Sequence, residues 1–252
     1  MKRILINADD FGWSESCSRA ILESMRKGYI TTTTACVNGD FFDEAVKMVI
    51  DQGCQNQVGI HLNITEGVAL TDDMKRFDDF YEDGHFNHKF SRTKPLSREK
   101  QMAVYNELTE QVLRFKESGL KIHHADSHNH IHNSPNIFSI FMRVMREQEI
   151  SDVRIFRNIG DIPWTKKVIK SLYNSYLKRH KYAYSDFFGS YEDFCFLNNK
   201  NINQLEMMLH PDYEKKQLVD RNPTADYESP YGLPLENMIA NIRKKGYEIL
   251  KL

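Results

Sequence analysis

The chain has 252 residues, of which 40% are apolar and 27% are charged, and its formal net charge is −1. This composition is typical of a globular protein with a sizeable core, so we expect a single domain over residues 1–252. Nucleic-acid-binding proteins usually carry a basic excess, so the charge argues against that class and we expect no nucleic-acid partner.

Targeting and redox signals are weak in this sequence. No apolar run approaches the roughly 18 residues that a membrane-spanning helix needs. The apolar run Ile4–Ile6 near the N-terminus is too short for a signal peptide, which predicts a cytoplasmic location. The four cysteines form no CxxC pair, so we expect reduced and mostly buried thiols.

The first quarter of the chain alternates between strand-like and helix-like segments. In chain order these are the strand Arg3–Ala8, the helix Ser14–Gly28, the strand Thr31–Val37, the helix Asp43–Gln52 and the strand Val58–Ile64. This alternation predicts an α/β fold built on a parallel sheet.

The pattern changes after the third strand. Residues 71–100 are charged, aromatic and poor in aliphatic side chains, which favours a long functional loop or lid. We then expect a helix over Ser97–Ser118, a strand near Lys121–Ala125 and a helix over Pro135–Glu147.

A basic amphipathic helix is predicted over Lys166–Lys181. Its apolar residues, at helical spacing, are Ile169, Leu172, Tyr173 and Tyr176. The favoured interpretation packs this face in the core and leaves the lysines in solvent. The alternative is contact with an anionic or membrane-linked substrate.

Two adjacent carboxylates, Asp9 and Asp10, follow the first predicted strand. Ligands of α/β proteins bind outside the carboxyl ends of strands. Adjacent side chains on an extended backbone point in opposite directions, so both reach one site only if the chain turns. A turn at Phe11–Gly12 would let one carboxylate bind a metal and the other approach a water molecule. The alternative is an Asx turn or a helix cap.

Histidines supply a second group of candidate ligands. His128, His130 and His132 stand at i, i+2 and i+4 in the run DSHNHIH. A strand would place all three on one face, and a helix would pair His128 with His132. Neutral imidazole and carboxylate are good transition-metal ligands, although a solvated polar loop is the alternative. His61, inside a predicted strand, is by itself consistent with a satisfied buried histidine.

A further histidine, His210, follows the apolar run 207–209 and precedes Pro211. Alone it is consistent with a capping or core residue.

Together, two histidines and one aspartate leave an open coordination position for water, as catalytic zinc sites require. Bound metal lowers the pKa of water from about 15.7 to roughly 7. A second carboxylate could accept the proton, and a separate histidine could protonate a leaving amine.

The motifs NADDFG, TTTTACVNG, GIHLNITEG, DSHNHIH and HPD, in this order, resemble those of the YdjC/ChbG-type carbohydrate deacetylases over nearly the whole chain. The resemblance implies a single-domain distorted β/α barrel, related to the NodB-type deacetylases. It also implies one divalent cation, bound by an Asp-His-His set.

Carried over by motif, the resemblance implies that the metal ligands are Asp10, His61 and His128. It implies that Asp9 is the general base and His210 the general acid, with Asp126 orienting a ligand. Trp13 stands where a smaller apolar residue is common, so it could stack on a sugar ring or pack in the core.

The expected activity is removal of the acetyl group from an N-acetylated sugar, such as a chito-oligosaccharide or a related glycoconjugate. Zinc or magnesium is the expected cation, with manganese or cobalt as alternatives. A metal-dependent phosphoesterase is a competing hypothesis, but acidic ligands for a second ion are few. A binding protein with a structural metal is a third, although such sites are usually closed by four protein ligands. The prevalence of C2 symmetry favours a homodimer.

Overall fold

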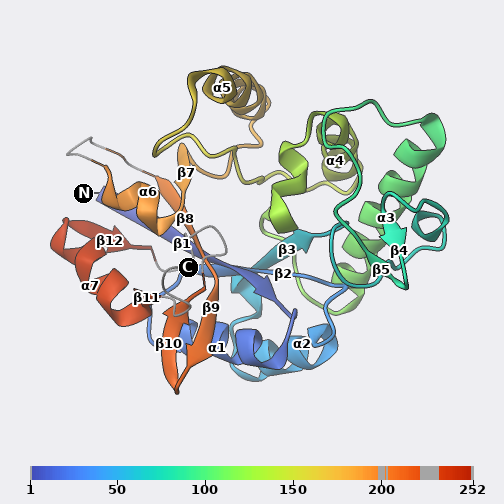
Figure 1. The fold of residues 1–252 in the computed structure, drawn as a ribbon. Coiled ribbons are helices and arrows are strands. Elements are labelled where there is room, and N and C mark those ends of the chain that lie inside the picture. Colours follow the sequence, from blue (N-terminus) through green and yellow to red (C-terminus); the bar gives the residue numbers. More distant parts are fainter. Residues whose placement is uncertain (1, 198–201, 203, 222–232, 251–252) are drawn as a thin grey trace. The chain divides into compact units, whose positions relative to one another are not determined.

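The computed structural model describes residues 2–197, 202, 204–221 and 233–250. Seven strands form the main sheet: β1 (Lys2–Phe11), β2 (Thr32–Ala35), β3 (Val58–Leu62), β6 (Ala125–Ser127), β7 (Phe187–Gly189), β8 (Leu205–Leu209) and β12 (Tyr247–Ile249). The helices are α1 (Glu15–Arg26), α2 (Phe42–Asp51), α3 (Arg98–Glu117), α4 (Pro135–Glu147), α5 (Trp164–Arg179), α6 (Tyr191–Cys195) and α7 (Leu235–Lys244) (Figure 1).

The main sheet has the hydrogen-bonded order β6-β3-β2-β1-β8-β7, and β12 pairs with the start of β1. The pairs β1–β8, β1–β12, β3–β6 and β7–β8 are all parallel. In this order β6 and β7 are the two ends, as in an incomplete barrel. The predicted α/β fold with a parallel sheet is confirmed.

Two small antiparallel sheets accompany the main one. One has the order β11-β10-β9 and consists of β9 (Pro211–Glu214), β10 (Gln217–Asp220) and β11 (Leu233–Pro234). The other is the hairpin of β4 (Tyr81–Glu82) and β5 (His85–Phe86).

The chain divides into two compact units. Unit 1 comprises Met1–Phe11, Glu15–Thr33 and Asp152–Leu252, and unit 2 comprises Gly12–Ser14 and Thr34–Ser151. Strand β2 belongs to both, because its first two residues lie in unit 1 and its last two in unit 2. The single domain expected from the sequence stays a prediction.

In unit 1 the central strand β1 is buried from Ile4 to Asn7 without alternation. A parallel strand covered on both faces produces such a continuous run. Helix α1 buries Ala20, Ile21 and Leu22, and it begins at Glu15, directly after Ser14, the residue predicted to cap it.

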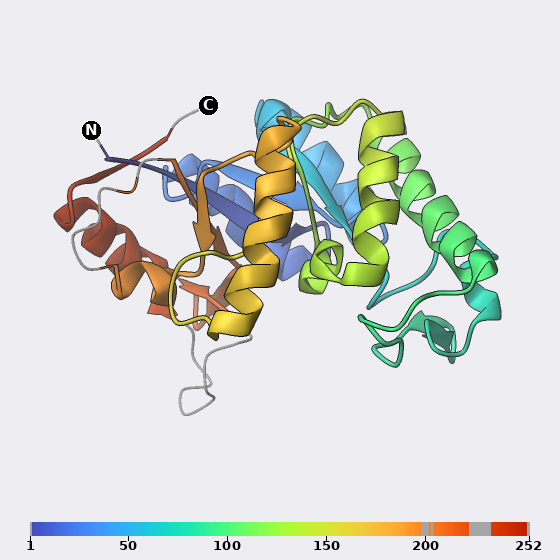
Figure 2. The same cartoon turned by 90° about the horizontal axis from the view of Figure 1, so that it is seen from above.

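In unit 2 helices α3 and α4 lie side by side (Figures 1 and 2). Helix α3 begins where Ser97 caps it, with the Ser97 Oγ accepting a hydrogen bond from the Lys100 N–H at 3.3 Å. Helix α4 begins with Pro135, whose missing N–H costs nothing at this position. Both helices agree with the predicted ranges. The strand predicted near Lys121–Ala125 instead runs over Ala125–Ser127.

Residues 71–100 have a small core of their own within unit 2. The rings of Phe80 and Phe90 stack with centroids 4.5 Å apart, and Phe86 is also buried. The aromatic residues of this stretch are therefore partly structural.

Among the described residues, no helix combines the length and apolar character needed to cross a membrane.

A buried glutamine connects α3 to the end of β3. The Gln111 Nε2 donates to the Asn63 carbonyl at 2.6 Å, and the Gln111 Oε1 accepts from the Asn63 N–H at 2.9 Å. Asn63 follows β3, so this pair of hydrogen bonds satisfies the backbone where that strand ends.

Replacing Gln111 with leucine should therefore destabilise the protein. Gln111→Leu leaves one buried N–H and one buried carbonyl without partners, and each costs about 1–3 kcal/mol. Urea denaturation followed by circular dichroism should show a loss of roughly 2–6 kcal/mol. Gln101→Leu, on the exposed side of the same helix, is the control and should leave the midpoint nearly unchanged. Equal effects of the two variants would contradict this account.

Candidate active site

The centre of the candidate site in unit 2 is a buried imidazole–carboxylate pair. His61 of β3 and Asp126 of β6 face each other in the parallel register, and the His61 Nδ1 lies 2.5 Å from the Asp126 Oδ1. The Thr34 hydroxyl donates to the second oxygen, Oδ2, at 3.1 Å. Metal-ligating histidines commonly engage one ring nitrogen with a carboxylate in this way, which fixes the tautomer and aims the other nitrogen at the metal.

His128 lies next to His61. The two rings meet edge to face with centroids 5.6 Å apart, and Trp13 stacks on His128 at 5.4 Å with an interplanar angle of 15°. Stacking on His128 is therefore a third role for Trp13, besides the two considered above, binding a sugar ring and packing in the core. Its ring fixes the orientation of a candidate metal ligand.

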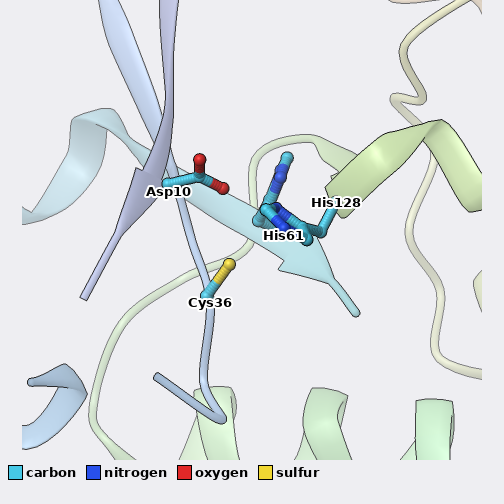
Figure 3. Close-up of side chains that lie close together, drawn as sticks. All are labelled: Asp10, Cys36, His61 and His128. Atoms are coloured by element: carbon cyan, nitrogen blue, oxygen red, sulfur yellow. The ribbon is translucent and has the colours of Figure 1, made fainter. Parts of the chain in front are cut away.

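A thiol completes this group in unit 2. The ligand atoms of Cys36, His61 and His128 lie within 4.8 Å of one another. Figure 3 shows these three side chains, and it also draws Asp10 of unit 1. The sequence analysis did not single out Cys36. Its place one residue after β2, at the carboxyl end of a strand, is the signal that could have done so.

The remaining histidines of the cluster have other roles. After His128 the backbone enters the left-handed region at Asn129 and His130, both with φ of 50°, so the segment is neither the strand nor the regular helix considered above. His132 turns into the core, where its Nδ1 lies 2.5 Å from the Ser127 Oγ and its ring packs on Phe141. The left-handed turn separates His128 from the histidines that follow it.

The imidazole of His128 also has a carboxylate neighbour. Its Nε2 lies 3.4 Å from an oxygen of Glu66, which accepts a further hydrogen bond from the Asn129 side chain at 3.0 Å. The hydrogen bond from His128, its charge and the Asn129 amide together lower the pKa of Glu66 to about 2, against the opposing effect of partial burial. Glu66 is therefore an anionic neighbour of the His128 ring within unit 2.

In unit 1, Asp9 and Asp10 lie near the carboxyl end of strand β1, which ends at Phe11. Asp10 has a φ of 70°, a left-handed conformation that aspartate tolerates better than most residues. The expected turn therefore occurs at Asp10 itself as well as at Gly12, where φ is 83°. Because the backbone turns there, the two adjacent carboxylates need not point to opposite faces of the strand.

Asp9 is held by a fully buried arginine. The two terminal nitrogens of Arg154 donate to the two Asp9 oxygens, each at 2.7 Å, and the Asn7 Nδ2 donates to the Asp9 Oδ1 at 2.9 Å. Such a bidentate pair fixes the plane of the carboxylate. Arg154 was not among the residues predicted from the sequence. A single charge inside the apolar run VRIF was the available signal.

Arg154 also bridges Asp9 to Glu206 of β8. The Arg154 Nε donates to Glu206 at 2.6 Å, and the guanidinium lies 4.7 Å from the centroid of Phe188. Both glutamate and arginine are completely buried. Burying these charges is costly, and mutual pairing with several hydrogen bonds offsets the cost.

His210 lies at the end of the strand beside β1. In the parallel pairing of β1 with β8, Ala8 faces Leu209, so Asp9 and His210 are the next residues at the ends of adjacent strands. The backbone N–H of His210 donates to the Asp220 Oδ1 at 2.6 Å. Burial raises the pKa of Asp220. The imidazole itself is partly exposed, as a proton donor to a substrate must be.

These observations define an α/β protein with imidazole, thiol and carboxylate groups at the carboxyl ends of parallel strands, the donor types of a transition-metal centre. A model of the YdjC-like protein family matches residues 3–251. The chain therefore belongs to the YdjC-like family.

Two relatives named carbohydrate deacetylase are similar to this chain. The one from Oceanobacillus iheyensis is 26% identical over 226 residues, covering 87% of this chain and 90% of the relative. The one from Clostridium beijerinckii is 26% identical over 258 residues, covering 98% of each. A solved structure from Enterococcus faecalis, described as a candidate cellobiose-phosphate cleavage protein, has a TM-score of 0.71 at 20% identity and covers 99% of this chain and 97% of its own. That likeness supports the fold.

Removing the buried arginine should be strongly destabilising. Arg154→Met leaves two buried carboxylates without their cation, which typically costs about 3–5 kcal/mol. Urea denaturation at neutral pH measures the loss. Arg143→Met is the control, because Arg143 is exposed, where it pairs with Glu147 at 2.9 Å and lies 4.1 Å from the centroid of the Tyr105 ring. An Arg154→Met protein as stable as the control would contradict the proposed balance of buried charges.

Proposed function

We propose that this protein is a divalent-metal-dependent deacetylase that hydrolyses the N-acetyl group of an acetylated amino sugar and releases acetate. The proposed metal ligands are Asp10, His61 and His128. The observation that carries the proposal is the buried Asp126–His61 pair beside His128, because it presents two oriented imidazoles in one place. The family membership and the relatives named carbohydrate deacetylase support the reaction and the substrate class.

Chain connectivity supports the inclusion of Asp10. Trp13, whose ring stacks on His128, is only three residues further along the chain. Three residues span at most about 11 Å, so the backbone of Asp10 stays close to that of Trp13. The left-handed turn at Asp10 allows its carboxylate to depart from the direction of the strand.

The donor set fits a divalent cation. Two neutral imidazoles and one carboxylate are ligands of catalytic zinc sites and leave a position for water. By affinity this set favours zinc, while availability could place magnesium, manganese or cobalt there. When bound, the cation would polarise the acetyl carbonyl and make water a stronger nucleophile near neutral pH.

Asp9 is the proposed general base. It would accept a proton from the attacking water as the oxygen of that water bonds to the acetyl carbon. Arg154 and Asn7 hold the Asp9 carboxylate in one plane, so it would be oriented before substrate arrives. Arg154 is thus a positioning residue for Asp9.

His210 is the proposed general acid. Breaking the amide C–N bond leaves an amine that must gain a proton, and an imidazole is suited to donate it near neutral pH. The position of His210 beside Asp9, at the ends of neighbouring strands, supports this role.

The direct test is acetate release. Protein loaded with zinc, cobalt or magnesium is incubated with di-N-acetylchitobiose, its 6-phosphate or N-acetylglucosamine. Wild type should release acetate from at least one of these sugars. Asp9→Asn should retain the metal but lose about 10²–10⁴-fold in kcat, because the base is gone. His61→Ala should lose both the metal and the activity.

A histidine outside the site provides the control. His85 is exposed on β5, so His85→Ala should keep full activity and metal content. Undiminished turnover by His61→Ala protein that contains no metal would overturn the proposed site. One bound metal per chain without acetate release from any of the sugars would overturn the proposed reaction on these substrates.

A further inference from the structure

The thiol of Cys36 lies close to the two histidines of the proposed metal site. Cys36 directly follows β2, and Thr34 lies within that strand. The Thr34 hydroxyl contacts both members of the buried pair, His61 at 3.3 Å and Asp126 at 3.1 Å. The Cys36 side chain is completely buried in this position.

The distances suit coordination by sulfur. In a tetrahedral zinc site, a sulfur at about 2.3 Å and a nitrogen at about 2.05 Å from the metal lie roughly 3.6 Å apart. The Cys36 Sγ and the ligand atoms of His61 and His128 are all within 4.8 Å of one another before any metal is bound. A contraction of at most about 1.2 Å between donor atoms would complete the geometry.

We propose that Cys36 is an additional metal ligand and that it makes the site selective for zinc or cobalt over magnesium. This inference rests on the proposed function, because it assumes the cation held by His61 and His128. Thiolate is a soft ligand that favours zinc and disfavours magnesium, whose preferred ligands are oxygens. The thiol loses its proton to solvent when the metal binds. Zinc accepts a fifth ligand, so water can still reach the ion when Asp10 also binds.

Cobalt spectroscopy tests this inference without measuring activity. Co²⁺ bound to a thiolate produces a sulfur-to-cobalt charge-transfer absorption in the near ultraviolet. Wild type should develop this absorption with one equivalent of Co²⁺, and Cys36→Ser should not. Cys36→Ser should also weaken zinc binding by at least about tenfold, equivalent to 1.4 kcal/mol, and narrow the preference for zinc over magnesium. Cys54→Ser, at a partly exposed cysteine, is the matched control.

The outcomes separate this inference from the proposed function. If wild type binds one Co²⁺ through His61 but shows no thiolate absorption, Cys36 is a bystander and the deacetylase proposal stands. If neither wild type nor Cys36→Ser binds metal, the metal site itself is wrong. Circular dichroism of each variant verifies that it is folded.

A second, independent inference concerns the exposed apolar side chains of helix α5. Only Asn174 and Leu177 of this helix are buried, and Tyr173 stacks on Phe156 with centroids 4.8 Å apart. Four large apolar side chains on the helix are more than half exposed: Trp164 at 77%, Leu172 at 68%, Val168 at 54% and Ile169 at 52%. The expectation that Ile169, Leu172 and Tyr176 pack in the core is therefore wrong. The helix is the gold one in Figure 2.

The charges on α5 indicate what kind of surface would cover these side chains. The helix contains the cations Lys166, Lys167, Lys170, Lys178 and Arg179 and no acidic residue, although Lys178 pairs with Asp186 at 2.8 Å. A second copy of the chain, packed on this face by a twofold axis, would bring two such cationic helices together. A bilayer with anionic lipids offers both an apolar interior and negative charge.

We infer that the exposed face of α5 binds the surface of anionic membranes. Trp164, Val168 and Leu172 would enter the boundary between headgroups and acyl chains, while the exposed Lys167 and Arg179 contact the headgroups. Such a helix lies in the interface and does not span the bilayer. This inference is independent of the reaction that the protein catalyses.

Vesicle co-sedimentation of the full chain tests the membrane inference. The protein should bind vesicles that contain phosphatidylglycerol and should bind pure phosphatidylcholine vesicles at least about tenfold more weakly, since each basic residue near the surface contributes about 1 kcal/mol. The double variant V168E/L172E should lose binding by about tenfold or more. Leu113→Glu, at a 40% exposed leucine on α3, is the matched control and should bind like wild type.

Two results would overturn this inference. One is failure of the wild type to bind either kind of vesicle. The other is equal binding to the two kinds, since that would remove the role of charge. If V168E/L172E converts a dimer into a monomer in light scattering and vesicles never bind, the face is instead an interface between copies of this chain.

Discussion

The stability of the structure depends on the pairing of its buried charged groups. The guanidinium of Arg154 lies entirely inside unit 1, between Asp9 of β1 and Glu206 of β8, and it is stable there only because both carboxylates accept its hydrogen bonds. Unit 2 repeats the principle with the imidazole of His61 and the carboxylate of Asp126. In each case a side chain with a proposed role in the reaction, Asp9 or His61, is held in one orientation by a charged partner. Side chains held in this way need little reorganisation when a substrate arrives.

The sequence alone predicted the fold class and much of the local structure. The ranges of helices α3 and α4 were predicted correctly because Ser97 and Pro135 mark their starts. Strand β1 was recognisable as a continuous apolar run. Most of what lies between residues 180 and 250 was not predicted. Strands such as β7, β10 and β11 contain two to four residues, too few for hydrophobic periodicity to show.

Residues of the candidate site could be predicted only where they belong to a motif of the family. The proposed roles of Asp9, Asp10, His61, His128 and His210 came from the family resemblance, and they remain proposals. Arg154 was missed because it is 145 residues from Asp9, and no local pattern reveals a pairing over that separation. Cys36 was treated as an ordinary buried thiol, since a single cysteine carries no spacing information. The apolar residues of α5 were misassigned because periodicity identifies an apolar face but not what covers it.

The left-handed backbone at Asp10 links a ligand position to the path of the chain. Few side chains tolerate this conformation, and asparagine and glycine are the principal alternatives to aspartate. Mutational drift at this codon is therefore channelled toward residues that preserve the turn while removing the negative charge. A lineage that replaces this aspartate with asparagine or glycine can therefore keep an intact fold while it changes the chemistry of the proposed site.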